Sequence, residues 1–434
     1  MTIASSLPRA RDLARQLSSD ISRIEGVLAD CRSAVEAREA EIKAFRFLDW
    51  GLVESQRREL HRVPAERHGP LFGVPVAVKD IFDTADMPTS YGSDIYAGHR
   101  PSADAACVAR LRAAGAIIAG KTVTTEFAFW HAGPTRNPHD TSRTPGGSSS
   151  GSCAGLAAGM FPLALGSQTA ASTMRPAAFC GITGYKPSRH WISRAGVKAL
   201  AGSTLDAVGV FGRCVDDVAL LAQVMAGIEM EDDGNSSLHP PVIATWQGRE
   251  WRDAEAYATS AVLDAADRLA SAGANVFKVT PASDFDRLID LQKLIMAREA
   301  ACDLAWEHLY RRDMLSDTLT DFLDEGAAIS AAGYQSALAS VDDCKSRIDQ
   351  LFGDADILAA PSAPGEAPLH ETGTGNPDMS RAWTLLDLPS LTIPAGTGPS
   401  GLPLGLQLAA RPGHDETLLG AARWIESKLG AHIP

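Results

Sequence analysis

The chain has 434 residues, of which 45% are hydrophobic, and carries a formal net charge of −13. A chain of this length and apolar content can bury a large core. The negative charge disfavours nucleic acids and anionic membranes as partners. No apolar run reaches the length of a membrane span, and the opening MTIASSLPRARDLARQ lacks a signal-peptide core. These features favour a soluble cytoplasmic protein with a small-molecule ligand.

The first 60 residues are charged and have a helical pattern. Apolar side chains recur at the spacing of one helix face: Leu13, Leu17, Ile21, Ile24 and Leu28. We expect a helical arm over residues 1–60 that packs on the rest of the chain. A homodimer contact is the alternative.

Residues 71–84, LFGVPVAVKDIFDT, contain a predicted strand that ends at Lys79. Valine alternates with other residues before the lysine, as in a strand that enters a packed core. Desolvation at such a place lowers the pKa of a lysine, as a general base requires. The alternative is an ion pair of Lys79 with Asp80 or Asp83.

The next segment contains a P-loop spacing and an aromatic cluster. GAIIAGKT, residues 115–122, has the P-loop spacing. However, strand-like isoleucines lie between its glycines, and β-branched residues follow where a helix should begin. Phe127, Phe129, Trp130 and His131 come next and are candidates to line an acyl or aryl pocket. Ordinary core packing is the alternative for at least two of them.

The stretch from residue 145 to residue 188 is poor in bulky side chains and carries two serine sites. It reads PGGSSSGSCAGLAAGMFPLALGSQTAASTMRPAAFCGITGYKPS, with Ser148 and Ser172 24 positions apart. Small residues let the backbone approach a ligand and leave N–H groups free to bind an anion. A serine in this setting is a candidate nucleophile if a base lies near it.

The base must come from elsewhere, because this stretch contains no histidine. A Ser–His–Asp triad would need the distant His131 or His414, and Lys79 is the other candidate. GSSSG, residues 147–151, also matches a nucleophile elbow around Ser149. That motif needs a preceding strand, whereas Thr-Pro-Gly before it predicts a turn.

The second half of the chain divides into three parts. The acidic EMEDDGNSSLHPP, residues 229–241, is loop-like. Residues 253–352 are alanine-rich and mostly helical, with one strand expected at 275–279. The remainder returns to strands and Pro/Gly turns and is expected to end in a helix near 415–429.

Two further patterns bear on cofactors and metals. GTGPSG, residues 396–401, has a dinucleotide-binding spacing, but Pro399 and the strand pattern after it favour a hairpin loop. The seven cysteines are dispersed without close pairs, which favours reduced thiols over disulfides or a zinc site. We expect neither a cofactor nor a metal.

Three motifs, GVPVAVKD, PGGSSSGS and GSQT…S…RPAAFCGITGYKPS, stand in the order and spacing of a known family. From Leu71 to Arg423 the chain resembles the amidase signature family of serine hydrolases, and most of all its malonamidase-like branch, because Arg175 lies three residues after the nucleophile. The resemblance implies one α/β domain over residues 61–434, a mixed sheet covered by helices on both faces. We expect residues 240–350 to form a mostly helical cap over the site.

The resemblance also implies the chemistry of the site. Ser172 is the implied nucleophile, Ser148 the bridging serine on a cis peptide after Gly147, and Lys79 the base. This relay would cleave the C–N bond of an amide through an acyl-enzyme. Backbone N–H groups from Thr169 to Ser172 would hold the oxyanion.

Ala170 and Ala171 depart from the Gly-Gly or Ala-Gly found in many family members. If either position requires a positive φ, alanine costs about 1–2 kcal/mol there. The two methyl groups would also narrow the space above Ser172.

The substrate remains open between several classes. Arg175 binds a substrate carboxylate in one interpretation and fixes the loop in the other. Phe127 and Trp130 are predicted to bind substrate, and aromatic walls favour anilides, aryl esters or carbamates (urethanes), whereas an exposed Arg175 favours small acids. The predicted function is a stand-alone amidase. The alternatives are an amidotransferase subunit that passes ammonia to a partner and a non-catalytic relative.

Overall fold

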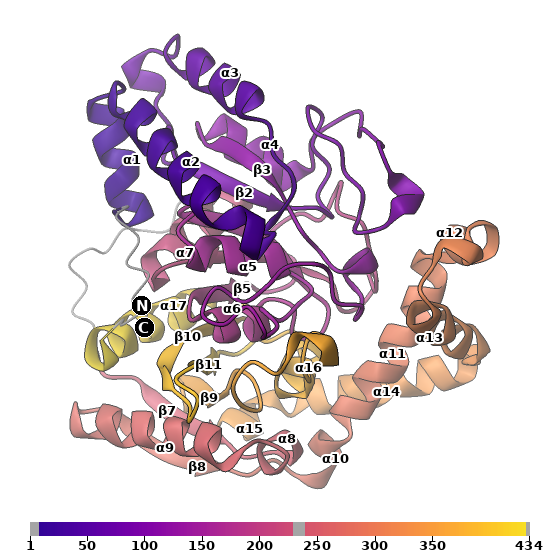
Figure 1. Ribbon diagram of the computed structural model, residues 1–434. Helices are drawn as coiled ribbons and strands as arrows, with labels where there is room; N and C mark the ends of the chain where they lie inside the picture. Colours follow the sequence, from indigo (N-terminus) through magenta and orange to yellow (C-terminus); the bar gives the residue numbers. More distant parts are fainter. Residues whose placement is uncertain (1–7, 229–238, 431–434) are drawn as a thin grey trace.

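The computed structural model describes residues 8–228 and 239–430, so most of the predicted acidic loop at 229–241 lies outside the described residues. Within those two ranges, eleven strands form one sheet in the order β1-β3-β2-β4-β6-β5-β10-β11-β9-β7-β8 (Figure 1). The strands are β1 Phe45–Phe47, β2 Pro75–Lys79, β3 Ile117–Thr122, β4 Leu163–Gln168, β5 Thr183–Lys186, β6 Ala207–Gly212, β7 Val242–Trp246, β8 Asn275–Val279, β9 Ile357–Pro361, β10 Ser390–Thr397 and β11 Pro403–Ala409.

The sheet is mixed. Strands β3, β2 and β4 run parallel, and so do β9, β7 and β8. Antiparallel pairs join these two groups through β6, β5, β10 and β11. The predicted class, one α/β domain built on a mixed sheet, is confirmed.

Helices cover both faces of the sheet. On one face α7 packs on β5 and β6, α17 on β10 and α9 on β9, whereas α5 and α6 pack on the other. The helices are α1 Ala10–Ser19, α2 Arg23–Ile42, α3 Trp50–Leu60, α4 Ala106–Ala113, α5 Ser150–Ala157, α6 Met174–Cys180, α7 Val215–Ala226, α8 Arg249–Arg252, α9 Ala256–Ser271, α10 Ser283–Asp286, α11 Leu288–Asp303, α12 Ala305–Tyr310, α13 Asp317–Ala328, α14 Ala331–Ser346, α15 Ile348–Phe352, α16 Asp378–Leu385 and α17 Asp415–Leu429. Short 3₁₀ turns occur at Ala65–Arg67, Asp94–Tyr96, Glu126–Ala128, Arg312–Met314 and His370–Thr372.

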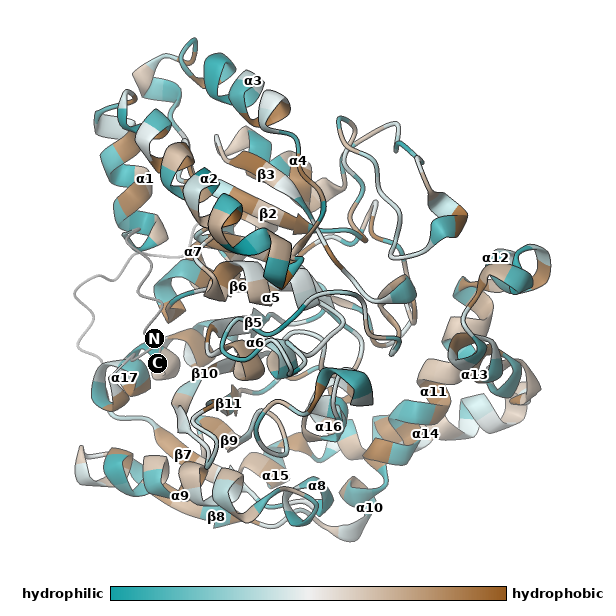
Figure 2. Ribbon diagram, in the orientation of Figure 1, coloured by the Kyte–Doolittle hydropathy of each residue, from teal (hydrophilic) through white to brown (hydrophobic). Residues whose placement is uncertain are grey.

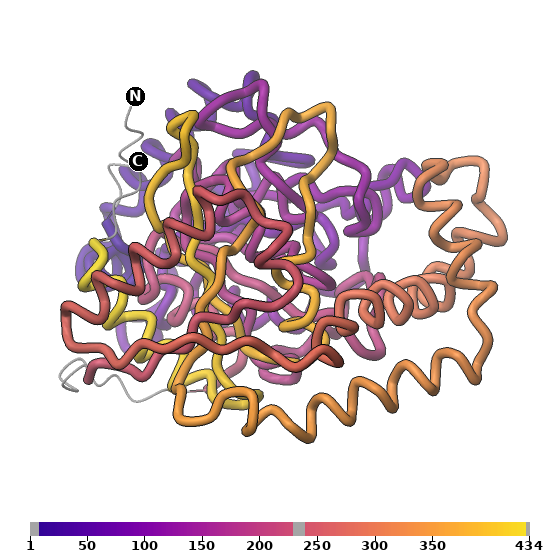
Figure 3. Tube along the Cα trace, turned by 90° about the horizontal axis from the view of Figure 1, so that it is seen from below, coloured from indigo at the N-terminus to yellow at the C-terminus, as the bar shows by residue number. Residues whose placement is uncertain are grey.

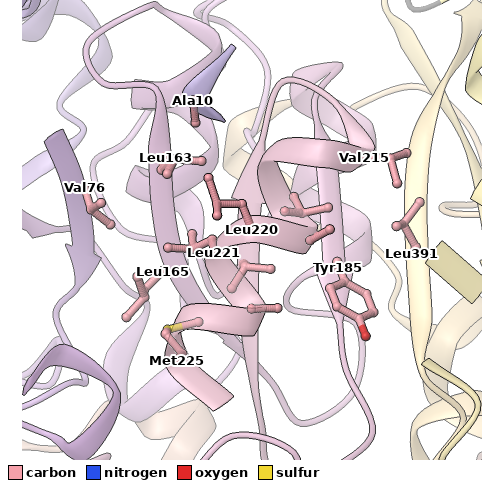
Figure 4. Close-up of a cluster of buried hydrophobic side chains, with 14 of the residues drawn as sticks. Ala10, Val76, Leu163, Leu165, Tyr185, Val215, Leu220, Leu221, Met225 and Leu391 are labelled. Atoms are coloured by element: carbon pink, nitrogen blue, oxygen red, sulfur yellow. The ribbon is translucent and has the colours of Figure 1, made fainter. Parts of the chain in front are cut away.

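The largest buried apolar cluster lies between the sheet and α7. Val76, Leu163 and Leu165 of the strands contact the layer that contains Leu220 and Leu221 (Figure 4). Burying one such side chain contributes about 1.5–3 kcal/mol. Brown strands inside and teal helix surfaces outside show the same division in Figure 2. The valine alternation before Lys79 thus places the lysine at the end of a completely buried strand.

The N-terminal arm packs on its own chain. Leu13, Leu17, Ile24 and Leu28 are buried in the same cluster, and Ile21 packs at its margin. Between the helices, β1 pairs with β3 at the edge of the sheet, which the helical pattern did not indicate. The dimer contact stays a prediction.

The segment 240–350 contains more sheet than predicted. The expected strand at 275–279 is β8, but β7 and α9 before it also belong to the sheet layers. β7 is a five-residue run whose partners lie far away in sequence, so it has no local signal. The helices from α10 to α15 follow, and α11–α14 project to one side of the molecule (Figures 1 and 3).

Both nucleotide-like motifs are parts of ordinary strand structure. Most of GAIIAGKT is β3, and a loop, not a helix, follows it, so the P-loop interpretation fails. GTGPSG joins β10 to β11, which confirms the hairpin. Each helix in the described part of the chain is too short or too polar to cross a bilayer.

Candidate active site

Lys79 lies among three serine hydroxyls at the end of β2. Its Nζ is 2.6 Å from Ser148 Oγ, 2.8 Å from Ser167 Oγ and 3.1 Å from Ser149 Oγ. The peptide bond between Gly147 and Ser148 is cis. Three contacts match a neutral amine, which has two N–H donors and one lone pair to accept the proton of a hydroxyl.

Burial decides the protonation state of this lysine. Lys79 has no exposed surface, and burial lowers its pKa to about 7. The predicted alternative, a pair with a neighbouring aspartate, does not form. Asp80 lies 3.0 Å from Lys121 Nζ on the next strand, and Asp83 accepts a hydrogen bond from Tyr91. Lys79 is therefore free to lose its proton near neutral pH.

The Asp80–Lys121 pair is itself completely buried. Lys121 Nζ also donates to the Phe82 carbonyl at 2.8 Å, and Asp80 accepts from Ser90 N–H and O–H at 3.0 and 2.6 Å. Lys121 is the lysine of the P-loop-like motif, so that motif serves packing and charge balance at the base of the site.

We expect Lys121→Met to destabilise the protein by about 3–5 kcal/mol, because it leaves the Asp80 carboxylate buried without a counter-charge. Denaturant unfolding monitored by circular dichroism measures the effect. The double variant Lys121→Met/Asp80→Asn is the control and should recover part of the loss. Equal stability of wild type and Lys121→Met would contradict the pairing.

Ser172 follows the loop after β4 and shares a small pocket with Ser148. The pocket holds about 30 Å³ and is also lined by Thr169, Ala170 and Ala171. Its free volume is close to that of about one water molecule. The structure thus brings the two predicted serines and the predicted oxyanion loop together around one cavity.

Side chains from distant elements hold the oxyanion loop. Gln168 Oε1 accepts from the N–H groups of Thr173 and Met174, at 2.9 and 3.1 Å. Thr384 Oγ1 donates to the Ala170 carbonyl at 2.7 Å, and Gln292 Nε2 donates to the Thr169 carbonyl at 3.0 Å.

The N–H groups of Ala170, Ala171 and Ser172 have no acceptor within residues 8–228 and 239–430. Donors that are held in place without an acceptor are what a developing oxyanion needs. Neither alanine has a positive φ, so the substitution for glycine carries no backbone strain. What the alanines change is space, since their methyl groups lie in the pocket wall.

Arg175 clamps two loops around the site. Its Nη2 donates to the Gly147 carbonyl at 2.7 Å and to Thr374 Oγ1 at 3.1 Å, and Nη1 donates to the Gly375 carbonyl. Burial, with the nearby charge of Arg381, lowers its pKa to about 9. Both terminal nitrogens are engaged by the protein, which favours the positioning role over carboxylate binding.

The aromatic residues after β3 divide between pocket and core. Phe129 and Trp130 line the pocket, as does Ala128. Phe127, predicted to bind substrate, is instead buried in the core, 6.1 Å from Tyr96 between ring centroids. Both Phe127 and Ala128 have a positive φ, 47° and 61°, and this tight turn directs the residues that follow toward the pocket.

Neither alternative source of catalysis is assembled. His131 is exposed, and His414 caps α17, with no contact to either serine within the described part of the chain. Ser149 is completely buried at the start of α5, and a loop rather than a strand leads into it, so the elbow interpretation fails.

Several functional residues escaped the sequence interpretation. They come from elements whose sequences carry no motif: Ser167, Asp206, Gln292, Thr374, Arg381 and Thr384. A polar residue on an apolar helix face is the one local signal, and Gln292 in α11 is an example.

Comparisons with known proteins agree with this geometry. The family model described as Amidase matches residues 27–419. The chain belongs to the amidase family. The enzymes of this family act on amide C–N bonds.

Relatives and solved structures span nearly the whole chain. The amidase is 34% identical over 451 aligned positions to a glutamyl-tRNA(Gln) amidotransferase subunit of Anaeromyxobacter dehalogenans (strain 2CP-C), covering 91% of each chain. A solved chain from a vestigial complex linked to the origins of an s-triazine catabolic enzyme superposes with a TM-score of 0.88 at 28% identity, covering 98% of this chain and 99% of that one. A structure described as an amidase gives 0.85 at 26%, covering 98% and 100%.

Proposed function

We propose that this protein is a stand-alone amide hydrolase that works through Lys79, Ser148 and Ser172. The observation that carries the proposal is the 2.6 Å contact between the buried Lys79 Nζ and Ser148 Oγ, with no carboxylate within ion-pair distance of the lysine in the described residues. Unpaired cysteines suit the reducing cytoplasm, where we place the enzyme.

Acylation begins when neutral Lys79 accepts the proton of Ser148. Ser148 takes the proton of Ser172, and Ser172 Oγ forms a bond to the carbonyl carbon of the amide. The carbonyl electrons move onto oxygen, where the N–H groups of residues 170–172 hold the charge. When the C–N bond breaks, the relay returns the proton to the leaving amine, which departs neutral.

Deacylation repeats these transfers with water. The relay accepts a proton from water, whose oxygen attacks the acyl carbon, and Ser172 leaves with a proton returned through Ser148. The product is a carboxylic acid. Small amides, anilides, aryl esters and carbamates are the proposed substrates, since Phe129 and Trp130 supply aromatic walls.

Arg175→Ala should lower turnover of every substrate together and also lower the melting temperature. The physical reason is that the carbonyl of Gly147, next to Ser148, loses its donor in a buried place, at a cost of about 1–3 kcal/mol. Parallel assays on acetamide, acetanilide and malonamate, with thermal unfolding, measure both effects. A loss confined to malonamate at unchanged melting temperature would instead assign Arg175 to substrate binding.

A second candidate is an amidotransferase component, because the curated relative described above carries that name over 91% of both chains. Affinity purification of the chain from its own cells separates the two functions. A stable stoichiometric partner together with glutamine-dependent ammonia transfer would favour the amidotransferase. Hydrolysis of simple amides by the isolated chain supports the stand-alone enzyme.

The direct test of the leading proposal is a hydrolysis screen over small amides, anilides, aryl esters and carbamates. Ser172→Ala serves as the matched inactive control. Turnover by the wild type alone supports the proposal. A chain that hydrolyses nothing and resists a covalent serine probe would be the non-catalytic relative.

A further inference from the structure

A larger cavity adjoins the catalytic pocket. Its volume is about 410 Å³, within the roughly 300–1,000 Å³ that small-molecule sites occupy. Its walls are mainly apolar side chains from the loop after β3 and from the α11–α13 segment: Phe129, Trp130, Leu294, Met296, Ala297, Phe322 and Ile329. We call this cavity the apolar chamber.

The apolar chamber and the catalytic pocket share part of their walls. Phe129, Trp130, Met296 and Arg381 line both. The catalytic pocket itself has room for little more than the reacting atoms, because the methyl groups of the alanine pair lie in its wall. A bulky group on the scissile carbonyl therefore finds its space in the chamber.

Arg381 stands at the junction with one donor unused. Its Nε donates to Asp378 Oδ1 at 2.7 Å, and Nη1 donates to Gln292 Oε1. Nη2 has no acceptor within the residues that the structure describes, although the side chain is only 3% exposed. The guanidinium lies 5.9 Å from the centre of the Trp130 ring, so the aromatic wall and the free donor are adjacent.

Charge around the junction favours an anion. Arg175, Arg381 and Lys293 face two carboxylates, Asp378 and Glu325, which leaves an excess of one positive charge. The terminal nitrogens of Arg175 are occupied by the protein, and its Nε is buried without an acceptor. Arg381 Nη2 is therefore the donor that can reach a ligand.

We propose that the apolar chamber binds an aryl or alkyl group of the substrate while Arg381 Nη2 donates to a carboxylate on the same acyl group. This inference rests on the proposed function and narrows its substrates to amides of acids that carry both an apolar group and a second carboxylate. Arg381, rather than Arg175, recognises the carboxylate.

Four amides test the two halves of the inference separately: acetamide, phenylacetamide, malonamate and phenylmalonamate, followed by ammonia release. Phenylmalonamate should have the highest kcat/KM, exceeding malonamate and phenylacetamide by about tenfold or more each, as expected for a buried ring and a charged hydrogen bond. Arg381→Gln should raise KM for the two malonamates about tenfold more than KM for phenylacetamide.

Ala297→Trp fills the apolar chamber without touching the catalytic pocket, since Ala297 lines the chamber alone. It should lower kcat/KM for each phenyl compound relative to its partner without the ring. Ala332→Trp, on the exposed surface of α14, is the matched control and should leave all four values unchanged.

Binding gives a readout that does not depend on turnover. Phenylmalonate should bind the Ser172→Ala protein in calorimetry, and adding Arg381→Gln should weaken Kd about tenfold or more. If the wild type hydrolyses all four amides with similar kcat/KM, or if Arg175→Ala and not Arg381→Gln is selective against the malonamates, this inference is overturned while the proposed function stands. If the wild type hydrolyses none and a fluorophosphonate does not label Ser172, the proposed function itself fails.

Discussion

Replacing Ser172 with alanine is expected to lower kcat for amide hydrolysis by roughly 10⁴-fold or more, as in other serine hydrolases that lose their nucleophile. The variant lacks the oxygen that forms the acyl-enzyme, while Ser148 and the oxyanion donors stay in place. Ser172 is a small buried residue, so its loss should leave the melting temperature nearly unchanged. Steady-state ammonia release from phenylacetamide measures the effect.

Covalent labelling identifies the nucleophile independently of the substrate. A fluorophosphonate should modify Ser172 alone, and peptide mass spectrometry locates the adduct. Ser149→Ala is the matched control, because Ser149 also lies 3.1 Å from Lys79 Nζ yet is completely buried. Its labelling should equal that of the wild type. An adduct on Ser149 would contradict the assignment and restore the elbow interpretation.

Replacing Lys79 with alanine is expected to lower kcat by roughly 10²–10⁴-fold, the usual contribution of a general base. Lys79→Arg should fail to restore activity, because arginine stays protonated and offers no lone pair. Initial rates at about pH 8, above the lowered lysine pKa, measure both variants. A variant that kept more than a few per cent of the wild-type rate would show that the relay is wrong.

The pH profile tests the same residue in the intact enzyme. Burial places the pKa of Lys79 at about 7, so kcat/KM should rise with pH through about 7 and then level off. Below that pH the lysine is protonated and cannot accept the proton of Ser148; above it the base is available. Lys186→Met is the control, since this second buried lysine, whose pKa burial lowers to about 8, donates to the Pro187 carbonyl away from the pocket. Its profile should keep the midpoint near that of the wild type.

The sequence by itself determined the family, the mixed α/β fold and the pairing of a strand-end lysine with small-residue serine loops. These features are local. The valine alternation before Lys79 predicts a buried strand from its immediate neighbours, and a strand that is buried along its whole length desolvates its last side chain. The same holds for the hairpin at 396–401 and for β8.

Only the tertiary structure decided what surrounds the reacting groups. Lys79 escapes an ion pair because Lys121, on the neighbouring strand, neutralises Asp80. Arg175 is engaged by the loop at 374–375, some 200 positions away, and Arg381 and Gln292 meet from separate helices. Each of these contacts joins residues whose own neighbours give no signal of them. Which donors are satisfied and which are left for a substrate depends on packing between distant segments, so no local pattern contains it.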